Sequence, residues 1–180
     1  AFIHRINRDL VDFYKKLLPW LFDQCQPDFM TFAEDMSYNH GSMISEPQFD
    51  EFMLPYYREL VDYIKQRGTK VLIDSDGDVS ECLPWFERAG IEGVLPLERQ
   101  AGVDVTDIRQ RHPSLLRVGA YNKMVMHRGE KAIREEFERL LPGAREGGFI
   151  ISVDHHTPPA VSLGDYRLYL RLFREYAQHL

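Results

Sequence analysis

The sequence predicts an α/β fold built on parallel strands, and two observations carry that prediction. Short apolar, β-rich runs alternate with longer segments of helical pattern, and each run ends at a polar cluster. The runs are Phe29–Phe32, Val71–Ile73, Gly93–Leu95, Leu115–Val118 and Phe149–Val153. Strands that alternate with helices are typical of a parallel sheet, because the chain has to return to the starting end of one strand before the next begins, and a helix covers that distance.

The first expected element is a helix over Arg5–Gln24. Its apolar side chains recur every three to four residues, which is the spacing of an amphipathic helix. Pro19 lies inside this segment, so the sequence predicts a kink or a restart there.

A long second helix is expected between the first two strands, from Ser45 to Arg67. Ser45 is the predicted N-cap, and Gly68 is the predicted stop. Pro55 falls in the middle of the segment and predicts a kink there.

The remaining connections are predicted to be shorter helices, each ended by a glycine, a proline or the end of the apolar pattern. They cover Ser80–Ala89, Asp104–Arg111, Gly129–Leu141 and Leu163–His179. The charged run Glu130–Arg139 is interpreted as a solvated helix face.

Composition limits the class of protein. With 180 residues and 44% hydrophobic content, the chain is expected to form one domain over residues 1–180. A net charge of −6 argues against nucleic-acid binding, which needs a basic face. The sequence contains no apolar run of about 20 residues and no signal-peptide pattern, so we expect a cytoplasmic protein that does not bind membranes.

Two architectures fit these elements. Five strands suffice for an open doubly wound sheet, whereas a closed (β/α)8 barrel needs eight strands and about 250 residues. A chain that opens with a helix looks instead like the later part of a barrel, with about five strand-helix units present. The pattern alone leaves both possibilities open.

The polar clusters at the strand ends predict one shared site, because the carboxyl ends of parallel strands converge on a single edge. Lys123 among these acids is expected to be either a substrate anchor or a structural ion pair. The clusters are Glu34 and Asp35; Asp74, Ser75 and Asp76; Glu98; Asn122 and Lys123; and Asp154, His155 and His156.

Four segments in order resemble the carboxyl-terminal half of the uroporphyrinogen decarboxylase superfamily. They are Gly41–Tyr57, Val71–Asp78, Leu95–Asp104, and Gly147–Ile150 with the following Asp154, His155, Pro158 and Pro159. The resemblance implies a partial barrel of the TIM (β/α)8 type. It also implies an enzyme, since the superfamily includes the porphyrinogen decarboxylase and methyltransferases that work with corrinoid carrier proteins.

The methyltransferase branch binds zinc through a His-x-Cys pair at one strand end and a cysteine at a later one. Here the matching positions are Asp74-Ser75-Asp76 and Asp154-His155. We therefore expect methyl transfer from a small methylated substrate, with Asp74, Glu98 and His155 catalytic and a corrinoid carrier protein as a partner. A divalent metal, Zn, Mn or Mg, is expected on Asp74, Asp76 and His155, with no organic cofactor. Without a metal, these groups would form a hydrogen-bonded network around a polar substrate.

Three alternatives remain. The first is decarboxylation of a porphyrinogen-like substrate, with Asp35 as the acid and Tyr38 orienting the substrate. The second is a non-catalytic half-barrel whose open edges pair with a second copy or with a missing amino-terminal half, which predicts an oligomer. The third, a DHH-type phosphoesterase, explains only Asp74–Asp76 and Asp154–His156. The expected substrate-binding residues are Glu34, Asp35, Tyr38, Lys123 and Asp154.

Overall fold

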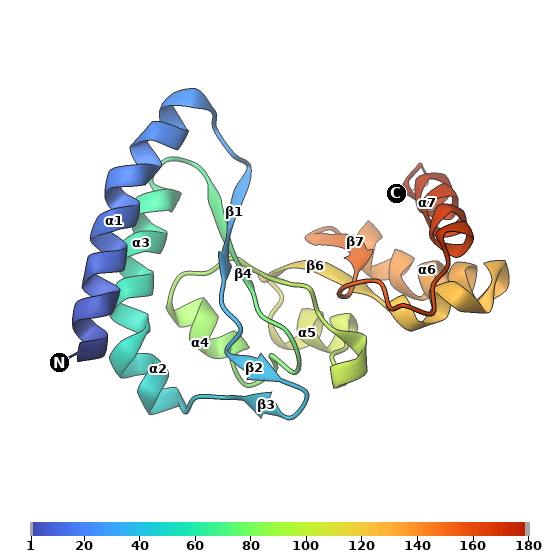
Figure 1. Ribbon diagram of the computed structural model, residues 1–180, viewed down its shortest axis with the longest axis horizontal. Coiled ribbons are helices and arrows are strands. Elements are labelled where there is room, and N and C mark those ends of the chain that lie inside the picture. The colour runs from blue at the N-terminus through green and yellow to red at the C-terminus, as the bar shows by residue number, and fades with distance from the viewer. Residues whose placement is uncertain (1, 179–180) are drawn as a thin grey trace.

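The computed structural model describes residues 2–178, and its centre is a five-stranded parallel sheet (Figure 1). The strand order is β1-β4-β5-β6-β7. The strands are β1 (Phe29–Ala33), β4 (Lys70–Asp74), β5 (Gly93–Leu95), β6 (Leu116–Tyr121) and β7 (Phe149–Val153). The order follows the chain without reversal, as in a barrel, whereas a doubly wound sheet reverses at a switch point. The fold is therefore a partial TIM-type barrel, and the doubly wound alternative is wrong.

The first helix, α1 (Phe2–Gln24), runs through Pro19 without a restart. A proline removes one backbone donor and frees the carbonyl four residues earlier, which here is that of Lys15. The Tyr63 hydroxyl of α3 (Leu54–Lys65) lies 3.5 Å from that carbonyl. The blue α1 and the teal α3 lie side by side at one end of the molecule (Figure 1).

The long helix predicted over residues 45–67 is divided into α2 (Glu46–Phe52) and α3 (Leu54–Lys65). The break falls at Met53, because Pro55 fits only the first turn of a helix. Ser45 caps α2 in a capping box with Gln48, as its sequence position predicts. Gly68, with φ +79°, follows the end of α3.

The later helices are α4 (Leu83–Arg88), α5 (Val105–Arg111), α6 (Glu130–Arg145) and α7 (Leu163–Ala177). The prediction that α4 begins at Ser80 is wrong: a helix from there would place Pro84 in its second turn, where a backbone donor is needed. The prediction that α6 stops at Pro142 is also wrong. That proline is tolerated near the helix end, and positive φ angles at Gly147 and Gly148 follow. His179, the predicted end of the last helix, lies outside the described residues.

Three features near the strand ends were not predicted. A two-stranded hairpin, β2 (Ser37–Tyr38) with β3 (Gly41–Ser42), follows β1. Two short 3-10 helices, η1 (Arg99–Ala101) and η2 (Lys123–Arg128), follow β5 and β6. Strand β6 also extends to Tyr121, three residues beyond the predicted Val118.

One hydrophobic core joins the outer face of the sheet to the surrounding helices. Along β7 the outward-facing Phe149 and Ile151 are buried, whereas Ile150 on the inner face is 58% exposed. The inner face is thus open among the described residues. A cavity of about 690 Å³ lies there at the amino ends of the strands, lined partly by Leu72, Leu116 and Ile150. This cavity contains none of the predicted site residues.

No helix among residues 2–178 is both long enough and apolar enough to cross a membrane.

Candidate functional site

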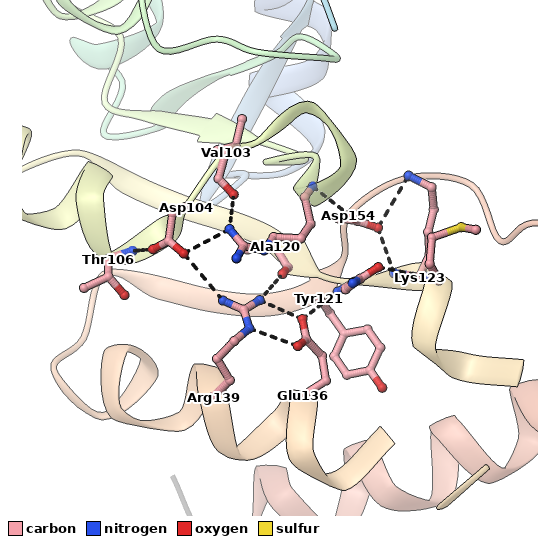
Figure 2. Close-up of polar contacts among 12 residues, drawn as sticks. Val103, Asp104, Thr106, Ala120, Tyr121, Lys123, Glu136, Arg139 and Asp154 are labelled. Carbon is pink, nitrogen blue, oxygen red and sulfur yellow. Dashed lines mark hydrogen bonds and ion pairs between the residues drawn. The ribbon is translucent and has the colours of Figure 1, made fainter. Parts of the chain in front are cut away.

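At the carboxyl edge of the sheet, three charged side chains form a connected unit that we call the strand-end clamp: Glu98, Lys123 and Asp154. Asp154, completely buried, accepts hydrogen bonds from the backbone amides of Arg99 (2.9 Å) and Lys123 (3.0 Å). The Lys123 ammonium donates to Glu98 Oε1 at 2.8 Å and lies 3.6 Å from Asp154 Oδ1. The contacts between Asp154 and Lys123 are drawn in Figure 2. The clamp therefore ties together the loops after β5, β6 and β7.

Glu98 extends the clamp to the loop after β4, because its Oε2 accepts the amide of Gly77 at 3.2 Å. Burial raises the pKa of Glu98, but the Lys123 ammonium and the Gly77 amide outweigh it, so the pKa lies below its usual range. Burial raises the pKa of Asp154 in spite of its two amide donors and Lys123. The clamp thus contains two carboxylates and one ammonium in a largely dry setting.

Beside the clamp lies a second unit, the loop carboxylates Asp35, Asp74 and Asp76, together with His155. The amide of Asp76 donates to Asp35 Oδ1 at 3.3 Å, and Asp76 Oδ2 lies 2.8 Å from His155 Nε2. Burial raises the pKa of Asp74, and the charges of Asp76 and Asp35 raise it further, while His155 opposes them. Among the described residues, no lysine or arginine forms an ion pair with any of these three carboxylates.

The β2-β3 hairpin is fastened to the loop that carries these carboxylates. The hydroxyls of Ser37 and Ser75 lie 3.0 Å apart, and both side chains are buried. The amide of Asp78 donates to the carbonyl of Tyr38 at 2.9 Å. Gly77 has φ +78°, and a Cβ there would lie 2.4 Å from the Tyr38 carbonyl carbon. Only glycine fits this approach. Tyr38 itself is 51% exposed.

Glu34 directly precedes Asp35, and its backbone amide donates to the Asp74 carbonyl at 2.8 Å. It lines a smaller cavity, about 290 Å³, between α1, β1 and α3, together with Tyr57. Burial is the main cause of the raised pKa of Glu34 and also of the raised pKa of Tyr57, to which the neighbouring Glu34 charge contributes. The structure therefore places Glu34 on the helix side of β1, and its contact with substrate stays a prediction.

A further set of side chains, which the sequence did not single out, braces the strand ends from the helix side (Figure 2). Arg99 donates to Asp104 at 3.0 Å, and Arg139 of α6 donates to Glu136 at 2.6 Å and to the Ala120 carbonyl at 3.1 Å. Glu136 accepts the amide of Asn122 at 2.9 Å, and its residue is only 8% exposed. The interpretation of residues 130–139 as a solvated face is thus wrong at Glu136.

The predicted metal ligands do not form a three-ligand group. Among residues 2–178, no group of three or more His, Cys, Asp or Glu side chains is arranged to hold a metal ion. Asp76 and His155 are hydrogen-bonded to each other. This donor arrangement does not fit a metal centre, so we derive no step through a metal. The metal itself stays a prediction: elemental analysis of protein purified without chelator tests it, with His155→Ala as the variant.

The comparisons with known proteins agree with the fold. Residues 28–176 match the family model described as uroporphyrinogen decarboxylase (URO-D). The chain therefore belongs to the uroporphyrinogen decarboxylase family, an enzyme superfamily, and its partial barrel is of that type. A search of curated proteins finds no match. The matched range includes Asp74–Asp76 and Asp154–His156, the two segments that suggested a DHH-type phosphoesterase.

Proposed function

We propose that the chain catalyses methyl transfer from a small methylated substrate at the loop carboxylates. The observation that carries the proposal is the setting of Asp74, whose pKa is raised by burial and by its acidic neighbours Asp76 and Asp35. A carboxyl group with a raised pKa keeps its proton to higher pH and can serve as a general acid.

The chemistry requires such an acid. When a methyl group leaves a substrate oxygen, the carbon–oxygen bond breaks and its electron pair stays on the oxygen. The methyl group joins the electron pair of an acceptor, and the oxygen takes a proton, which Asp74 would supply. The pair formed by Asp76 and His155 would hold the substrate's polar groups or return a proton from water.

The distribution of charge favours this reaction over decarboxylation of a porphyrinogen-like substrate. A substrate with several carboxylates needs free cations, but Lys123 is paired with Glu98 and Asp154, and Arg99 is paired with Asp104. The loop carboxylates carry no compensating lysine or arginine among the described residues. This edge of the sheet therefore suits a neutral or cationic substrate better than a polyanion. Decarboxylation, with Asp35 as the acid, is the second candidate.

For the acceptor, we propose a corrinoid on a separate carrier protein. This partner comes from the family resemblance. The open inner face and the exposed Tyr38 are compatible with a bulky acceptor that approaches from outside.

The test is a methyl-transfer assay with reduced cobalamin as the acceptor and a panel of methyl ethers and methylamines as donors. We expect transfer by the unsubstituted protein and a loss of about 10²–10⁴-fold in Asp74→Asn, the usual range for a general acid. The rate should fall as pH rises through the pKa of Asp74, because the proton is lost.

Lys131→Met, on an exposed turn of α6, is the matched control and should transfer at the normal rate. Transfer that is unaffected by Asp74→Asn would overturn the role of Asp74. Release of CO₂ from a porphyrinogen, without methyl transfer, would establish the second candidate instead.

A further inference from the structure

We propose that Lys123, Glu98 and Asp154 are positioning residues that set the loop bearing Asp74 and Asp76, and that they do not contact the substrate. The inference rests on the proposed function, in that the loop carboxylates are taken to carry the chemistry. It differs from the sequence prediction, which assigned catalysis to Glu98 and substrate binding to Lys123 and Asp154.

The polar groups of the clamp are already occupied. Both oxygens of Asp154 accept backbone amides, and both oxygens of Glu98 accept hydrogen bonds, one from Lys123 and one from Gly77. The exposed fractions of the side chains are 0% for Asp154, 10% for Lys123 and 17% for Glu98. A substrate would have to break buried, charge-assisted hydrogen bonds to reach these groups.

The clamp also connects the loops that follow four neighbouring strands. The hydrogen bonds run from Asp154 at the end of β7 to Lys123 after β6, then to Glu98 after β5, and finally to Gly77 after β4. Gly77 directly follows Asp76, whose carboxylate pairs with His155. The position of the catalytic loop therefore depends on a charge that lies two strands away.

The loops that the clamp joins also contain strained backbone. Leu97, next to Glu98, has φ +61°, and Ala120, near Lys123, has φ +62°. Non-glycine residues in this region cost about 1–3 kcal/mol each and persist only where the surroundings impose them. The close approach of Gly119, whose Cβ would meet the Pro96 carbonyl, shows how tightly the loops after β5 and β6 are packed.

The charged groups around the clamp are few. Glu98 faces Lys123 and, at longer range, His155. Asp154 faces Lys123 and Glu98, and Arg139 acts on it from α6. Replacing Lys123 by methionine keeps the length of the stem but leaves two buried carboxylates facing each other. Glu98 would then take up a proton or turn away, and its bond to Gly77 would weaken.

The experiment is NMR of the whole chain without substrate, at one pH near neutrality, so its result does not depend on the proposed reaction. In Lys123→Met we expect amide hydrogen exchange at Gly77 to become at least about tenfold faster. The Gly77 amide and His155 imidazole resonances should also move. Lys123→Arg keeps the charge and should restore both signals toward their normal positions.

The matched control is Glu87→Gln, which removes the charge from the 2.7 Å pair with His112, a pair that includes no residue of the clamp. It should lower stability and leave the Gly77 and His155 signals in place. Unchanged signals in a folded Lys123→Met protein, or equal changes in the control, would overturn the proposal. If Lys123→Met does not fold, Glu98→Gln carries the same test, because it keeps the shape of the side chain and removes its charge.

Discussion

The strand-end clamp and the loop carboxylates lie at the same edge of one sheet and are both rich in acids, yet their environments differ. In the clamp, each carboxylate meets an ammonium or backbone amides, and Asp154 is fully buried. Among the loop carboxylates, the acids face one another, and Asp76 is 37% exposed. Acids at the strand ends of this sheet are therefore not all equivalent. The clamp acids are compensated by a lysine and by backbone amides, whereas the loop carboxylates have no lysine or arginine partner among the described residues.

The largest expected effect is on stability when the clamp loses its cation. Lys123→Met leaves two buried carboxylates unpaired and should lower the free energy of unfolding by about 3–5 kcal/mol. Urea unfolding measures this change. Lys131→Met removes an 89% exposed cation from an i,i+4 pair and should cost no more than about 0.5 kcal/mol. Equal losses in the two variants would mean that the clamp is not a buried charge unit.

The next effect concerns the backbone that joins the two units. Gly77→Ala introduces a Cβ against the Tyr38 backbone at a positive φ and should cost at least about 3 kcal/mol. Gly102→Ala is the matched control, because its φ is +89° with open space around it, and it should cost about 1 kcal/mol. Thermal unfolding compares the two. A Gly77→Ala loss no larger than that of Gly102→Ala would show that the hairpin does not press on this loop.

A smaller effect is expected in the acid dependence of stability. The folded-state pKa of Glu98 is lowered, so its contribution is present above the unfolded-state pKa and is lost as pH falls through the folded-state pKa. Unfolding measured from neutral to acid pH should show this loss. In Glu98→Gln, that part of the acid dependence should disappear. The difference in free energy of unfolding between Glu98→Gln and the unsubstituted protein should therefore become smaller toward low pH. A difference in free energy of unfolding that does not change with pH would contradict the assignment of a negative charge to Glu98.

The sequence predicted the five strands and the convergence of their ends because the hydrophobic run and the polar stop are both local signals. It predicted the cap at Ser45 for the same reason, and the structure confirms it. The extension of β6 to Tyr121 was missed. Gly119 and Ala120 are not typical strand residues. The end of β6 is held by contacts distant in sequence, such as the hydrogen bond from the Ala120 amide to the Pro96 carbonyl.

The roles of the charged residues depend on contacts distant in sequence. The sequence predicts Lys123 as either a substrate anchor or a member of a structural ion pair. Its partners, Glu98 and Asp154, are distant in sequence and could not be identified from the residues around Lys123. Glu136 and Arg139 have the spacing of surface ion pairs. Only the position of α6 against the end of β6 turns them inward, toward Asn122 and Ala120. The position of Asn122 after a strand was visible in the sequence, but nothing in the sequence of α6 indicated that its charged residues would contact that strand end.

The division of the strand-end acids into two groups can be tested by measuring the free energy of unfolding at pH 7 for two amide variants, Asp74→Asn and Glu98→Gln. The pKa of Asp74 is raised in the folded protein, so the folded state holds this proton more tightly than the unfolded state does, and the negative charge of Asp74 opposes folding once pH rises through that pKa. We predict that Asp74→Asn leaves stability unchanged or raises it by up to about 1 kcal/mol. Glu98→Gln should lower it by about 2–3 kcal/mol. Losses of the same sign and similar size would contradict the division of this edge into a scaffold and a reactive group.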